Sequence, residues 1–181
     1  MTSTPAHPSS VKPAPGRLVK TSAAAGHAPD DDAVGTGHPD PRLSGAEPIS
    51  GPRPISVLLY SDDVDTRSAV KLAVGRRPAA DLPVVEWTEC ATRAAATAAA
   101  DSGRMDLLIL DGEAAPAGGM GLCKQFKEEI YRCPPVLVLT GRPQDAWLAT
   151  WSLADAAVPH PLDPVAVAEA VADLARRRLS A

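Results

Sequence analysis

The chain has 181 residues, which is enough for one domain with a tail. Its formal net charge is −4 and no stretch supplies the basic patch that a duplex-binding surface needs, so we expect no nucleic-acid-binding surface. It starts without the pattern of a signal peptide and holds no apolar run of about 20 residues. The three cysteines have no paired metal-ligand spacing, which fits a reducing compartment. We therefore expect a cytoplasmic protein that does not itself insert into a membrane.

Residues 1–54 differ in composition from residues 55–181. The first part holds ten of the nineteen prolines, six of the thirteen glycines and no aromatic residue. Its few large apolar residues are scattered, so alone it buries too little surface to offset the entropy of the chain. Two interpretations stay open: a passive solubilising tail, or an extended segment that orders on a partner.

From Ile55 onward, short apolar runs alternate with segments of helical periodicity. The pattern predicts strands at 55–60, 84–90, 107–111, 136–140 and 156–158. It predicts helices at 64–76, 91–102, 120–131, 143–152 and 164–179. Continuously apolar strands that alternate with helices indicate a parallel sheet covered on both faces. We therefore predict an α/β domain of the flavodoxin-like, doubly wound kind over residues 55–181.

Polar side chains stand where the predicted strands end. They are Ser61, Asp62, Asp63, Asp111, Thr140 and His160. In a doubly wound sheet these ends meet at one edge, where functional sites collect. Two simpler interpretations stay open. An aspartate at a strand end often caps the following turn without any chemistry, and for His160 we favour a packed imidazole between two prolines.

These residues carry a resemblance to the receiver domains of bacterial response regulators. Residues 57–67 resemble the first-strand signature, Asp111 matches the phosphoacceptor and Thr140 the hydroxyl residue. His160-Pro161 stands where receivers carry a lysine–proline pair. The resemblance implies magnesium held by an acidic pair and the acceptor aspartate, and a phosphoryl group whose oxygens contact the lysine and the threonine. It also implies a cis peptide bond before Pro161.

Several positions depart from the receiver pattern. Ser61 replaces the first acidic residue, which leaves Asp62 and Asp111 for magnesium, so we expect weak binding of this ion and no other cofactor. A histidine at position 160 is shorter than lysine and supplies little charge near pH 7. Ala157 stands where receivers often carry an aromatic switch residue. We therefore expect Asp111 to be a vestigial phosphoacceptor.

Trp147 and Trp151 lie four residues apart and share one face of their predicted helix. One interpretation places one ring in the core and leaves the other half-exposed. The other makes the pair an aromatic anchor for a protein partner.

The segments around Asp111, Thr140 and His160 also resemble orphan receiver-like proteins of mycobacteria and related actinobacteria, which are linked to the proton-pumping NADH:quinone oxidoreductase. This resemblance implies a non-catalytic accessory module that binds the cytoplasmic part of that respiratory complex through its tail. The alternative is a single-domain response regulator phosphorylated on Asp111 in a phosphorelay. An independent enzyme is not expected, because the sequence has neither a phosphate loop nor a dinucleotide fingerprint.

Overall fold

The computed structural model describes residues 51–181. Of the predicted tail, residues 1–50 lie outside the described residues, so its proposed role is a matter for experiment. Within residues 51–181, no helix has both the length and the apolar character needed to cross a bilayer.

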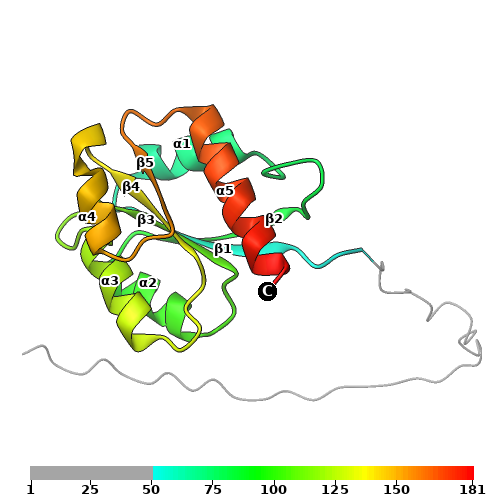
Figure 1. The fold of residues 1–181 in the computed structure, drawn as a ribbon, viewed down its shortest axis with the longest axis horizontal. Helices are drawn as coiled ribbons and strands as arrows, with labels where there is room; N and C mark the ends of the chain where they lie inside the picture. Colours follow the sequence, from blue (N-terminus) through cyan, green and yellow to red (C-terminus); the bar gives the residue numbers. More distant parts are fainter. Residues whose placement is uncertain (1–50) are drawn as a thin grey trace, which may run out of the picture. The chain divides into compact units, whose positions relative to one another are not determined.

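Five parallel strands form one sheet in the order β2-β1-β3-β4-β5 (Figure 1). They are β1 (Ile55–Tyr60), β2 (Val85–Cys90), β3 (Leu107–Asp111), β4 (Val136–Thr140) and β5 (Ala156–Pro159). The strand order reverses between β1 and β3, which confirms the predicted flavodoxin-like topology. At such a switch point the carboxyl ends of adjacent strands open a crevice.

Helices cover both faces of the sheet (Figure 1). They are α1 (Val64–Val74), α2 (Arg93–Asp101), α3 (Gly119–Glu129), α4 (Ala146–Trp151) and α5 (Pro164–Leu179). Helices α1 and α5 pack together on one face, and α2 and α3 lie on the other with α4 beside α3. Alternate residues along each strand therefore contribute to two hydrophobic cores, one on each face of the sheet. Leu59 and Ile109 pack toward α1 and α5, whereas Leu58 and Leu110 pack toward α2 and α3.

Helix boundaries differ from the predicted ones, and the residues at the helix ends give the reasons. Helix α2 begins at Arg93 because the Thr92 hydroxyl accepts a hydrogen bond from the Ala95 N–H at 3.2 Å. Helix α1 ends at Val74 because Gly75 takes φ of 64° and ψ of −152°, a conformation that suits glycine. The predicted helix at 143–152 opens instead with a 3-10 turn, Pro143–Asp145, and only then becomes α4.

Candidate functional site

A cleft of about 390 Å³ opens at the carboxyl ends of the strands. Its lining consists of Asp62, Asp63, Thr66, Asp111, Glu113, Gly141 and His160. The structure therefore brings together most of the polar residues that the sequence singled out. A larger hollow of about 660 Å³ lies between α1 and α5 and contains none of these side chains. We place the candidate site in the cleft, because the strand-end chemistry is there.

Both carboxylate oxygens of Asp111 have partners inside the protein. The residue is buried, with 3% of its surface exposed. Its Oδ2 accepts a hydrogen bond from the Ser61 hydroxyl at 2.7 Å, and its Oδ1 accepts one from the backbone N–H of Glu113 at 2.9 Å. These bonds stabilise the carboxylate where it stands. They also draw electron density from the two oxygens that would attack a phosphoryl group, which makes both weaker nucleophiles.

Ser61 joins the end of β1 to the end of β3. It is fully buried, and its hydroxyl, which donates to Asp111, also accepts a hydrogen bond from the Asp63 N–H at 3.1 Å. Its carbonyl accepts a hydrogen bond from Arg67 at 2.6 Å. The sequence marked Ser61 only as a missing carboxylate. The structure gives it a role of its own as a buried hydroxyl that satisfies its neighbours.

Asp63 serves as the amino-terminal cap of α1. Its Oδ1 accepts from the Asp65 N–H at 3.0 Å, and its Oδ2 accepts from the N–H and the hydroxyl of Thr66 at 3.2 and 2.8 Å. The hydroxyl bond is the main reason that the pKa of Asp63 lies below its ordinary value. Of the two aspartates, Asp63 is therefore the one committed to the helix end.

The side chains present do not fit a tight magnesium site. Asp63 is occupied with capping, and Ser61 provides a neutral hydroxyl where a receiver has a carboxylate. Asp62 and Asp111 remain as possible carboxylate ligands. Magnesium needs near-octahedral oxygen ligation and gives up its water reluctantly. Between residues 51 and 181, no three His, Cys, Asp or Glu side chains are grouped as metal ligands.

His160 faces Asp111 without bonding to it. Its Nε2 lies 3.9 Å from Asp111 Oδ1, too far for a hydrogen bond, and is a buried atom with no hydrogen-bond partner among the described residues. Its backbone N–H donates to the carbonyl of Thr140 at 2.7 Å, which joins β4 to the loop after β5. The peptide bond to Pro161 is cis, as predicted.

Thr140 and Ala157 are the remaining positions of the site that have counterparts in receivers. The Thr140 hydroxyl is buried and donates to the carbonyl of Arg142 at 3.3 Å. Ala157 lies opposite Val138 in the β4–β5 pair. Its methyl group cannot swing toward Thr140 as an aromatic ring would.

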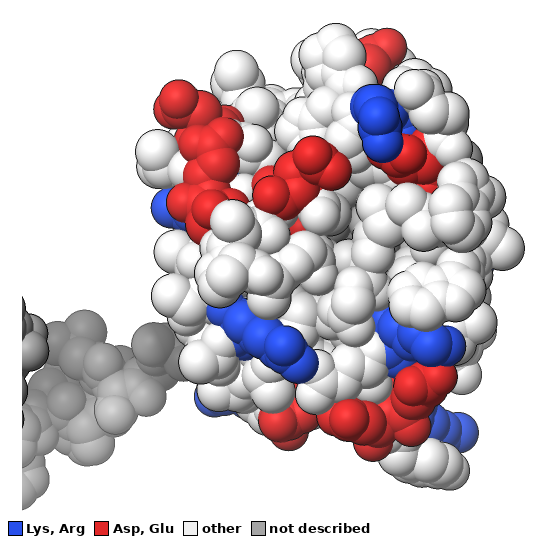
Figure 2. Space-filling view, turned by 90° about the vertical axis from the view of Figure 1, so that its left-hand side faces the viewer, with Lys and Arg blue, Asp and Glu red and all other residues white. Residues whose placement is uncertain are grey.

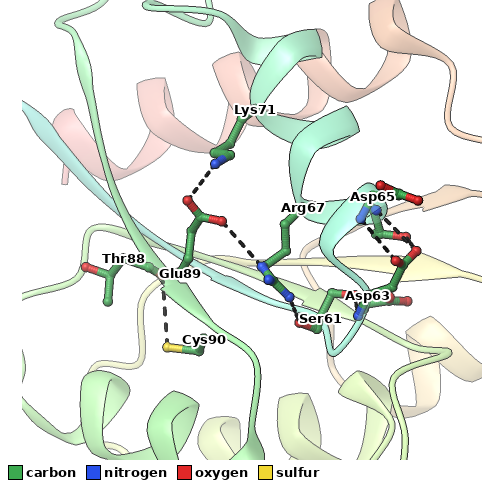
Figure 3. Close-up of polar contacts among 10 residues, drawn as sticks. Ser61, Asp63, Asp65, Arg67, Lys71, Thr88, Glu89 and Cys90 are labelled. Carbon is green, nitrogen blue, oxygen red and sulfur yellow. Dashed lines mark hydrogen bonds and ion pairs between the residues drawn. The ribbon is translucent and has the colours of Figure 1, made fainter.

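Two positive charges near the β1 end are already paired with a carboxylate (Figure 3). Arg67 donates to Glu89 at 3.3 Å, and Lys71 donates to the same carboxylate at 2.6 Å. The hydrogen bond from Lys71 is the main reason that the pKa of Glu89 lies below its ordinary value. No lysine or arginine appears among the residues that line the cleft.

Acidic side chains gather in both the upper and the lower part of the face toward which β1 runs (Figure 2). The upper part of this face carries several groups of acidic side chains, one of them surrounded by uncharged surface.

Sequence reasoning missed Glu113 in the cleft, because only the fold brings the loop after β3 to the end of β4. Its one signal was an acidic residue two places after Asp111.

Both tryptophans of α4 are exposed. Trp147 has 65% and Trp151 55% of its surface accessible, so neither ring is in the core. The Lys124 ammonium lies 5.2 Å from the centre of the Trp151 ring, within the range of a cation–π contact. The interpretation that one ring is buried is therefore wrong, and the partner role stays a prediction.

Comparison with known proteins gives relatives in sequence and in structure. No family model matches the sequence. An uncharacterized response regulatory protein, found in two strains of Mycobacterium tuberculosis, is 52% identical over 122 residues, which are 67% of this chain and 92% of that protein.

Solved structures show the same fold. A putative response regulator from Chloroflexus aurantiacus matches with a TM-score of 0.59 at 22% identity, covering 69% of this chain and all of that one (100%). A CheY-like receiver domain protein from Methanospirillum hungatei matches with a TM-score of 0.57 at 16% identity, covering 71% and 98%. At these identities the likeness concerns the fold alone.

Proposed function

This chain belongs to the response regulator receiver family, and from that premise we propose that it is a pseudo-receiver, a non-catalytic module that acts by binding a protein partner. One observation carries the proposal. Both oxygens of Asp111 are hydrogen-bonded within the protein, and the charge that would assist phosphoryl transfer is missing from the cleft. Phosphoryl transfer depends largely on positioned positive charge, which makes this loss a severe one.

For the partner, we propose the cytoplasmic part of the respiratory NADH:quinone oxidoreductase. The support is the resemblance to the actinobacterial receiver-like proteins. Receivers interact with other proteins, and the exposed rings of Trp147 and Trp151 offer an aromatic contact of the kind that anchors interfaces. The segment 1–50 is proposed as a second contact, because its composition suits a chain that orders on a partner.

The test is recovery of the partner complex from cells that make tagged versions of the chain. A version that begins at Gly51 retains every described residue, including Arg53 and its ion pair with Asp106. We expect this version and the double variant Trp147→Ala/Trp151→Ala to recover at least about tenfold less complex, which corresponds to about 1.4 kcal/mol. Asp111→Asn is the matched control and should recover as much as the parent.

The competing function, phosphorylation on Asp111, has a direct test. The full chain is incubated with magnesium and a small acyl phosphate, and its intact mass is measured. A stoichiometric adduct of one phosphoryl group that disappears in Asp111→Asn would replace our proposal with a working response regulator. Equal recovery of the complex by the full chain and the version from Gly51 would remove the role of the tail.

A further inference from the structure

Gly141 leaves a space that another side chain fills. A Cβ built on Gly141 would collide with Oε1 of Glu113 and lie 2.9 Å from its Oε2. The positive-φ glycines of the described chain are Gly75 and Gly103, so the backbone of Gly141 does not itself demand glycine. The carboxylate of Glu113 therefore lies against the backbone just after β4, in a space that exists because residue 141 has no side chain. We call this space the seat of Glu113, and any larger residue at position 141 would fill it.

This seat lies beside the buried acceptor carboxylate. Glu113 and Gly141 both line the cleft, and the backbone N–H of Glu113 holds Asp111 Oδ1 at 2.9 Å. The lining thus carries the carboxylates of Asp62, Asp63, Asp111 and Glu113, and its one potential cation is His160. An anion that enters meets like charge, and like charges repel more strongly where protein displaces water.

We propose that Glu113, seated on Gly141, is the residue that excludes phosphoryl donors from Asp111. Asp62 and Asp63 lie on the β1 side of the cleft, whereas Glu113 reaches across from the loop after β3 to the end of β4. The inference deepens the proposed function and rests on it, because both take the site to be shielded from phosphoryl transfer. It adds that one displaceable side chain, that of Glu113, is the main part of the shield.

The reaction that Glu113 would prevent is the transfer of a phosphoryl group from an acyl phosphate to Asp111. An Asp111 carboxylate oxygen would attack the phosphorus of an acyl phosphate. The bond from phosphorus to the acyl oxygen would break, the carboxylate of the donor would leave with the electron pair, and Asp111 would become an acyl phosphate. Each negative charge near the phosphorus raises the barrier for the anionic donor to approach.

Two variants test the charge and the seat separately. Glu113→Gln keeps the shape of the side chain and removes its charge, and Gly141→Ala keeps the charge and fills the seat. Each is measured in the parent chain and in a His160→Lys background, where a lysine supplies the missing cation. The readout is the initial rate at which acetyl phosphate, with magnesium present, adds a phosphoryl mass to the chain. We expect both variants to label about threefold to tenfold faster than their own background.

Matched controls isolate the effect. Gly121→Ala adds the same methyl group on α3, where nothing lies within 4 Å of the new atom, and Glu86→Gln removes a charge from an exposed position on β2. Both should label at the background rate. No gain for Glu113→Gln in either background overturns the inference, and so does an equal gain for Gly121→Ala or Glu86→Gln. A gain for Glu113→Gln with none for Gly141→Ala overturns the role of the seat.

The proposed function and the shield fail in different ways. The first fails when the Gly51 version and the tryptophan variant recover the partner complex as well as the parent does. The second fails on the relative labelling rates, which are measured on the isolated full chain without any partner.

Discussion

At the end of β1, a hydroxyl bonds to Asp111 where a receiver would place a second carboxylate. The Ser61 Oγ to Asp111 Oδ2 distance is 2.7 Å, and both residues are buried. Two carboxylates at that distance would repel unless a cation lay between them or one took up a proton. A serine and an aspartate attract each other without help. With Ser61 in this position, the buried carboxylate of Asp111 has a hydrogen-bond donor and needs no metal ion to offset a second negative charge.

Removal of this hydroxyl should destabilise the fold. Ser61→Ala leaves Asp111 Oδ2 buried without its donor, so we expect the free energy of unfolding at pH 7 to fall by about 1–3 kcal/mol. Urea denaturation measures the change. In the Asp111→Asn background the same substitution should cost less, because the buried acceptor is no longer charged. An equal cost in both backgrounds would mean that Ser61 acts through packing and not through this bond.

Magnesium should matter little to the parent chain and more to a variant with its carboxylate restored. With about 10 mM magnesium and a dissociation constant no tighter than that, binding adds at most about 0.4 kcal/mol. Ser61→Asp restores a second buried carboxylate, which should lower stability without metal and make it depend on magnesium. Thermal unfolding with magnesium or with chelator gives both values. A large magnesium shift in the parent would contradict our account of the cleft.

At the scale of the elements, the strand boundaries were the easiest feature to predict. The bounds of β3 and β4 match the predicted ranges, because each is a short apolar run that is buried on both faces. Helix ends were harder, because the capping bond that Thr92 accepts from the Ala95 N–H sets the start of α2. The residues at the strand ends could be listed from the sequence. Their bonds could not, because contacts such as that between Glu113 and Gly141 join segments far apart in the chain.

The start of β1 is tied to the start of β3 by one ion pair. Arg53 donates two hydrogen bonds to Asp106, at 2.6 and 2.8 Å, and the Ser56 N–H donates a third at 3.0 Å. The bond from Arg53 is the main reason that the pKa of Asp106 lies below its ordinary value. This pair holds the described chain at the amino end of the sheet, at the opposite edge from the cleft.

The ion pair predicts a pH dependence. A carboxyl whose pKa is depressed by folding adds stability above its unfolded pKa, about 3.9, and loses it as the pH falls through the folded value. Because Arg53 is largely exposed, we expect Arg53→Ala to cost about 0.5–1.5 kcal/mol at pH 7. The difference from the parent should shrink below pH 4 in urea titrations. Arg77→Ala, at another exposed arginine, is the control, and a difference that stays constant down to pH 2 would contradict the assignment.

Across the whole molecule, burial and exposure separate a rigid sheet from a peripheral helix. Strands β3 and β4 are buried at every position, with helices over both faces. Helix α4 has six residues, begins after a 3-10 turn and exposes both of its tryptophans. Few buried side chains hold it down, so its local opening should cost much less than global unfolding. Helix α4, which we propose to contact a partner, is thus the element that can change its conformation at a low cost in free energy.

Amide hydrogen exchange tests this division. We expect the amides of α4 to exchange at least about a hundredfold faster than those of β3 and β4, because the strands open only with the whole fold. The Lys124 contact on Trp151 should slow α4 slightly, so Lys124→Ala should speed its exchange and leave the strands unchanged. Binding of a partner to the tryptophans should slow α4 alone. Exchange in α4 as slow as that in β3 would mean that this helix is part of the rigid core and that any partner must fit it as it stands.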